Sequence, residues 1–134
     1  MITEDYVSFE IAKLLKEKGF DENTPVNYFV GDDKPRGCMV GEMIYHKRLE
    51  EDTHLIACPT LQMAMKWLRR EHNLHCNSNY DIVLGWYCEI TSLTETVEYD
   101  YLEMKHYHPD KDNCFSSQEE ACEEAIKYCL ENLI

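Results

Sequence analysis

Hydrophobic residues recur every three or four positions in three segments of the chain, a spacing that predicts amphipathic helices. The first helix is expected to begin after Ser8, which can cap it, and to end at Gly19, which can adopt a left-handed conformation. The second is expected between Thr60 and Asn73, and the third begins after Ser117. The pattern thus predicts three helices that are widely separated along the sequence.

The third helix has the clearest separation of apolar and charged positions. Ser117 and Glu120 have the spacing of a capping box, in which each side chain caps the backbone near the other. Five apolar residues share the side that we expect to be buried: Cys122, Ala125, Ile126, Cys129 and Leu133. Acidic residues share the other side, which we expect to face solvent.

Shorter segments between the helices alternate apolar and polar residues, and this period of two predicts β-strands. The predicted strands cover residues 26–30, 38–45, 54–57 and 80–90, with a further strand from Val97 that contains a bulge near Tyr101. Residues 31–37 read as a turn. Together the elements predict an α+β fold, with one antiparallel sheet of about four or five strands and three helices packed mainly on one face. At 134 residues, the chain is expected to form a single domain over 1–134.

The charge of the chain limits the classes of molecule that it can bind. It contains 26 acidic and 13 basic residues, which give a formal net charge of −13. Such a chain repels phosphate backbones, so we expect no direct binding to nucleic acid. An acidic protein that mimics nucleic acid, and thereby inhibits a DNA-binding protein, is an alternative that the charge alone allows.

The sequence predicts a cytoplasmic protein. It has no apolar run near the roughly 20 residues that span a bilayer, so no membrane association is expected. The first residues are acidic, whereas a secretory signal begins with basic residues. The seven cysteines show no paired spacing, which predicts reduced thiols and no intramolecular disulfide.

One segment contains the residue types of a metal site. His106 and His108 are two residues apart and share one face of a strand, and Asp110, Asp112 and Cys114 follow closely. These side chains could bind zinc, but a solvated acidic loop is the favoured interpretation because no second pair of ligands has a recognised spacing. We therefore expect no cofactor and no metal requirement for folding.

Two other clusters suggest chemistry less strongly. His72, His75 and Cys76 lie near the end of the second helix, where a histidine is already favoured by the helix dipole. Cys58 precedes the same helix and follows His54, the arrangement of a candidate thiolate and base. The favoured interpretation is that the cysteines act as small hydrophobic residues, because several occupy apolar stripes. No catalytic residue is assigned.

The second helix carries the predicted partner surface. Its apolar stripe does not include Met63 and Trp67, which lie four residues apart and close to Lys66 and Arg70. Either another part of the chain covers the indole or another molecule does, because exposed apolar area is unfavourable. If it is exposed, these four residues have the composition of an interface, with a homodimer as the simplest use.

The three helical segments also carry a resemblance. Residues 6–20 (YVSFEIAKLLKEKGF), 59–69 (PTLQMAMKWLR) and 119–130 (EEACEEAIKYCL) resemble small uncharacterised proteins of Bacteroides-type gut bacteria and their prophages. That group has no established activity, so the resemblance implies only an intracellular accessory protein of phage or mobile-element type. The favoured function is non-enzymatic binding of a protein partner, or self-association. A small metal- or thiol-dependent enzyme is the alternative.

Overall fold

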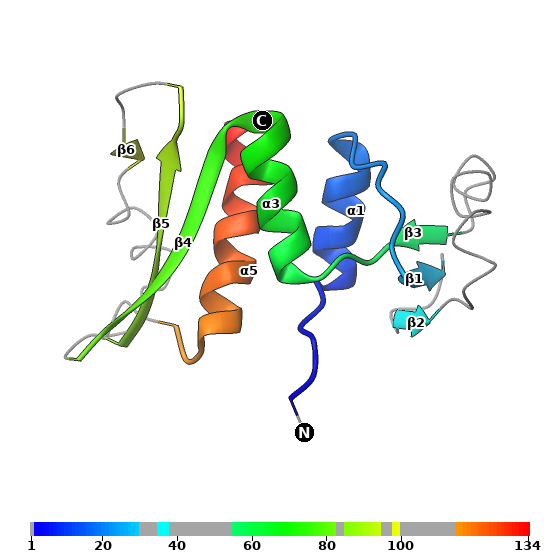
Figure 1. Cartoon of the computed structure of the whole chain (residues 1–134), viewed down its shortest axis with the longest axis horizontal. Coiled ribbons are helices and arrows are strands. Elements are labelled where there is room, and N and C mark those ends of the chain that lie inside the picture. Colours follow the sequence, from blue (N-terminus) through cyan, green and yellow to red (C-terminus); the bar gives the residue numbers. More distant parts are fainter. Residues whose placement is uncertain (1, 30–34, 38–54, 83–84, 95–97, 100–114) are drawn as a thin grey trace. The chain divides into compact units, whose positions relative to one another are not determined.

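A computed structural model describes residues 2–29, 35–37, 55–82, 85–94, 98–99 and 115–134. These residues form three α-helices, a π-helical segment and two small antiparallel sheets (Figure 1). The chain divides into two compact units, Met1–Met63 and Ala64–Ile134, and each is described by itself. A single domain over 1–134 stays a prediction. No helix in the described part is both long enough and apolar enough to cross a membrane.

The first unit contains one helix and one three-stranded sheet. Helix α1 covers Phe9–Glu17. The strands β1, β2 and β3 cover Val26–Phe29, Pro35–Gly37 and Leu55–Ala57, and they are antiparallel in the order β2-β1-β3. The expected strands at 26–30 and 54–57 are thus confirmed in β1 and β3, whereas 35–37 belong to a strand and not to a turn. The expected strand over 38–45 lies outside the described residues.

Helix α1 begins and ends where its sequence predicts. The Ser8 side chain accepts a hydrogen bond from the Ile11 backbone N–H, and Gly19 follows the helix with a φ of 93°. The Phe20 N–H donates to the Leu15 carbonyl over 2.9 Å, and both of these side chains are buried. This pattern is the Schellman ending, in which a left-handed glycine allows the next residue to fold back on the helix.

Helix α3 covers Leu61–His72, begins in the first unit and continues in the second. The Thr60 hydroxyl accepts a hydrogen bond from the Met63 N–H over 3.1 Å, which confirms the expected cap. Asn73 follows the helix with a φ of 55°, a left-handed conformation that asparagine tolerates better than most residues. Both ends of the second predicted helix are therefore correct.

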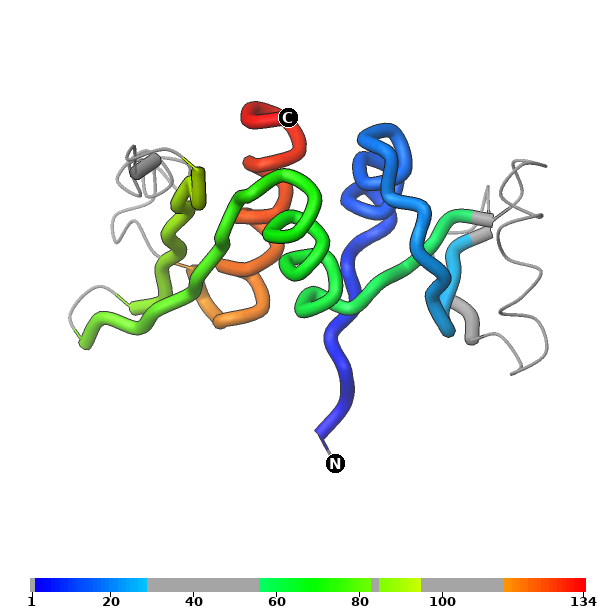
Figure 2. The backbone as a smooth tube through the Cα atoms, turned by 45° about the horizontal axis from the view of Figure 1, so that its top comes forward, coloured from blue at the N-terminus to red at the C-terminus, as the bar shows by residue number. Residues whose placement is uncertain are grey.

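The second unit contains the other sheet and the last helix. Strands β4, β5 and β6 cover Leu74–Asp81, Gly85–Ser92 and Glu98–Tyr99, and they are antiparallel in that order. Helix α5 covers Gln118–Tyr128 and continues into the π-helix η1 over Cys129–Leu133. In Figure 2, α5 runs alongside β4 and β5, and its buried side packs on these two strands.

The mixed helix and strand class with antiparallel sheets is confirmed. A single sheet of four or five strands with the helices on one face is not, because the described strands form two separate sheets of three. The predicted strand over 80–90 is not continuous: Tyr80 and Asp81 end β4, Ile82 lies in a turn, and β5 begins at Gly85. The remaining part of the strand from Val97, with its bulge near Tyr101, lies outside the described residues except for β6.

Helix α5 has the predicted cap but a different ending. The Ser117 side chain accepts from the Glu120 N–H, and the Glu120 carboxylate accepts from the N–H and the hydroxyl of Ser116. Four of the five expected stripe residues are buried, whereas Leu133 is half-buried and Leu130 takes a fully buried position. The difference begins where the α-helix changes to η1, because a π-helix places more residues in each turn.

Candidate functional site

The end of the β4–β5 hairpin presents large apolar side chains to solvent. Tyr80 and Trp86 are paired across the two strands, and their rings meet edge to face with centroids 5.2 Å apart. Tyr80 is 62% exposed, Trp86 is half-buried, and Ile82 in the adjoining turn is 90% exposed. We call these three residues the hairpin end.

Helix α5 begins near Ser78, two residues before Tyr80 on β4. Gln118, the first residue of α5, donates from Nε2 to the Ser78 hydroxyl over 3.1 Å. Side chains two residues apart on a strand share a face, so Tyr80 continues the face of Ser78 beyond the first residue of the helix. The sheet thus has an apolar face that is longer than the helix that packs on it.

The predicted partner surface on α3 is only partly exposed. Lys66 and Arg70 are exposed and Met63 is half-buried, but Trp67 retains only 7% of its exposure. The Trp67 indole packs edge to face on the His72 imidazole, with centroids 4.7 Å apart. The chain itself therefore covers this indole, which is one of the two outcomes that the sequence left open. Binding of a partner by these four residues stays a prediction.

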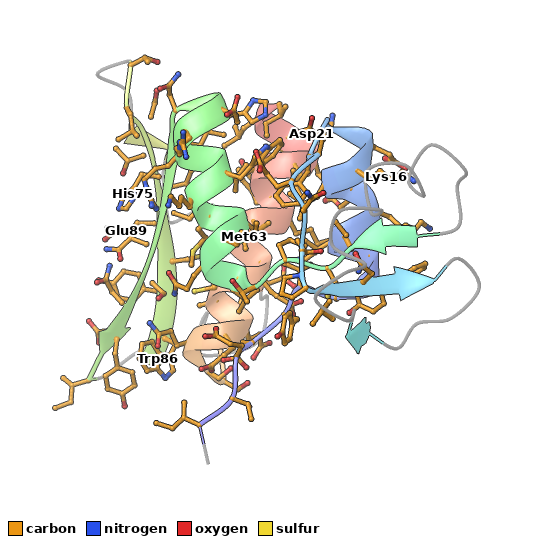
Figure 3. The ribbon with its side chains drawn as sticks, turned by 45° about the vertical axis from the view of Figure 1, so that its right-hand side comes forward. Lys16, Asp21, Met63, His75, Trp86 and Glu89 are labelled. Atoms are coloured by element: carbon orange, nitrogen blue, oxygen red, sulfur yellow. The ribbon has the colours of Figure 1, made fainter. Side chains whose placement is uncertain are left out.

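The cluster of His72, His75 and Cys76 does not converge on one point. His72 contacts Trp67, and the Cys76 thiol contacts the Cys129 thiol. His75 precedes Cys76 on β4 and therefore faces the other side of the sheet, where Figure 3 shows it pointing away from the helices together with Glu89. In the described part of the chain, no three His, Cys, Asp or Glu side chains could hold a metal ion. The candidate ligands His106, His108 and Asp110 lie outside that part, as do Asp112 and Cys114.

The described surroundings of Cys58 favour a neutral thiol over a thiolate. Its side chain is buried, and its Sγ donates to the Val7 carbonyl over 3.6 Å. The Tyr28 hydroxyl donates to the same carbonyl over 2.8 Å. Burial raises the pKa of Cys58 to about 11, and the hydrogen bond with Tyr28 opposes this rise only in part. Near pH 7 the group is therefore a neutral thiol, and His54, its proposed base, lies outside the described residues.

The raised pKa of Cys58 predicts a loss of stability in alkaline solution. Between its usual pKa of 9.0 and about 11, the unfolded chain releases this proton while the native chain retains it. The contribution to stability is present below pH 9 and is lost as the pH rises through 11. Urea unfolding at pH 8, 9, 10 and 11 should show a falling midpoint, with a shallower fall in Cys58→Ala.

Other groups titrate in the same pH range. The difference between wild type and Cys58→Ala therefore isolates the contribution of Cys58. Cys88 is a second contributor, because burial raises its pKa to about 12, with smaller contributions from neighbouring thiols. Cys88→Ala should therefore also reduce the alkaline fall. An identical pH dependence in wild type and both variants would show that the buried thiols are not the cause.

No protein family model, no curated protein and no solved structure matches this chain. The comparisons therefore supply no activity for this chain.

Proposed function

We propose that this chain is a non-enzymatic, cytoplasmic accessory protein of phage or mobile-element type, which binds a protein partner or a second copy of itself. The resemblance of the three helical segments to prophage proteins supports the assignment to an accessory protein of phage or mobile-element type. The formal net charge of −13 favours a protein partner over nucleic acid.

The hairpin end is the observation that carries the proposed binding. Tyrosine and tryptophan are enriched in protein interfaces because they combine a large apolar surface with a polar group. Here an edge-to-face Tyr80–Trp86 pair lies beside a nearly fully exposed Ile82. Covering this surface would contribute about 25 cal/mol for each Å² of apolar area removed from water.

The state of the thiols favours a binding protein over a thiol-dependent enzyme. All five cysteines in the described residues are buried, and burial raises the pKa of both Cys58 and Cys88. A nucleophilic cysteine needs the opposite, a lowered pKa and access for its substrate. A metal-dependent enzyme built on the 106–114 segment stays the alternative.

Serine substitutions at the hairpin end test the proposed function. Tyr80→Ser/Ile82→Ser should leave the thermal transition within a few degrees of wild type, because both side chains are exposed. The same variant should lose either the concentration-dependent rise in mass measured by sedimentation or the capture of an identified protein that wild type binds. Leu93→Ser is the matched control, since Leu93 is also exposed and directly follows the other end of β5.

The outcome that contradicts the proposal is specific. If the double variant retains the mass and the bound protein of wild type, the hairpin end is not the binding surface. A parallel variant, Lys66→Glu/Arg70→Glu, tests the surface on α3 in the same assays. Loss of binding in this variant alone would show that the interface lies on α3. The proposed function as a binding protein would still hold.

A further inference from the structure

Two buried thiols of the second unit lie against each other. Cys76 is on β4 and Cys129 is the first residue of η1, and their Sγ atoms are 3.6 Å apart. Both side chains are buried, and the two residues are 53 positions apart in the sequence. A thiol from the sheet thus meets a thiol from the helical layer that covers it.

From this contact we infer that Cys76 and Cys129 form a reversible disulfide when the protein meets a low-molecular-weight disulfide such as oxidised glutathione. The Sγ atoms need to approach by about 1.6 Å to reach the usual bond length near 2.0 Å. The protein would then exist in two covalent states. In one state both thiols are reduced, and in the other a disulfide joins β4 to η1.

Two other pairings, Cys122 with Cys129 and Cys76 with Cys88, are less suited to a disulfide. Cys122 and Cys129 are seven residues apart on a helical segment, which separates them by about 10 Å, beyond the usual reach of a disulfide. Cys88 pairs in register with Ser78, so Cys76 is its diagonal neighbour on the sheet. Such diagonal side chains lie about 7 Å apart, whereas the Cβ atoms of a disulfide lie about 4 Å apart.

The reaction balances as two successive thiol–disulfide exchanges. One protein thiol loses its proton, and its thiolate attacks oxidised glutathione, forming a mixed disulfide and releasing one glutathione thiolate. The second protein thiolate attacks the protein sulfur of that mixed disulfide and releases the second glutathione. The two cysteines lose two electrons and two protons, and one glutathione disulfide becomes two glutathione thiols.

The same surroundings make the exchange slow. The hydrogen bond with Cys129, together with burial, raises the pKa of the Cys76 thiol well above its usual range, while Arg69 acts in the opposite direction. Attack therefore requires a local opening of the sheet–helix contact, followed by deprotonation. Reduced thiols in a reducing compartment and a disulfide under sustained oxidation are both consistent with this barrier.

Peptide mapping of oxidised protein tests the inference. Wild type is incubated with excess oxidised glutathione, digested without reduction and examined by mass spectrometry. We expect a peptide pair joined through Cys76 and Cys129 that has lost two hydrogens and is restored by dithiothreitol. Because the bond closes a loop of about 50 residues, the thermal midpoint should rise by about 10 °C or more.

Single alanine variants separate this pair from the other thiols. Cys129→Ala should lose both the linked peptide and the rise in midpoint, whereas Cys122→Ala, which removes a buried thiol of the same helical segment, should retain both. If a variant does not fold, mapping of wild type still decides. A bond between other cysteines, or only glutathione adducts after prolonged oxidation, would overturn the inference.

Discussion

Replacing Trp67 with alanine is expected to lower the free energy of unfolding by about 3–5 kcal/mol, the usual cost of removing a large buried aromatic side chain. Trp67 is only 7% exposed, and its indole packs on the His72 ring. Alanine removes this ring contact and leaves a cavity that neighbouring side chains can fill only in part. Urea unfolding followed by circular dichroism measures the loss.

Lys66→Ala provides the matched control because Lys66 is the preceding residue on α3 and is exposed. Its free energy of unfolding should stay within about 0.5 kcal/mol of wild type. An unchanged unfolding midpoint in Trp67→Ala, together with a lower mass in solution, would instead show that Trp67 belongs to a partner surface. The two readouts therefore distinguish core packing from interface binding at one residue.

The ends of the helices could be predicted from the sequence because their causes are local. Ser8, Thr60 and Ser117 each accept a hydrogen bond from a backbone N–H three residues later, as their positions predict. Gly19 and Asn73 adopt left-handed conformations just after their helices. Each of these features depends on fewer than six neighbouring residues, all of which are visible in the sequence.

Strand β4 could not be predicted because its stability comes from its neighbours. Its sequence, LHCNSNYD, contains only two residues that become buried, Leu74 and Cys76. Pairing with β5 along all eight of its residues, together with packing by α5, compensates for this polar composition. The sequence alone does not show that β4 pairs with β5. The alternation of apolar and polar residues beyond Tyr80 therefore predicted one strand that continues through the turn at Ile82.

The contacts that matter for the candidate sites are also long-range. The start of α5 lies against Ser78, 40 positions earlier in the sequence, close to the hairpin end. The meeting of Cys76 and Cys129 depends on how that helix lies on the sheet. Sequence spacing identified the cysteines as apolar residues, and their burial agrees with this, but it contained no signal for which two would meet.

Two leucines in η1, Leu130 and Leu133, differ in burial. The sequence places Leu133 on the buried stripe of a continuous α-helix, whereas the structure buries Leu130 completely and leaves Leu133 half-buried. A π-helix bonds each N–H to the carbonyl five residues back, so side chains beyond Cys129 are rotated from their α-helical positions. The two substitutions should therefore have unequal effects.

Leu130→Ala is expected to lower the free energy of unfolding by about 2–5 kcal/mol, because it removes a fully buried side chain and leaves a cavity. Leu133→Ala should cost only about 1 kcal/mol, since water already reaches part of its side chain. Both variants keep a good helix former at the position, so helix propensity does not separate them. Equal losses, or a larger loss at Leu133, would show that the helix continues as an α-helix through residue 133 and that the sequence period was right.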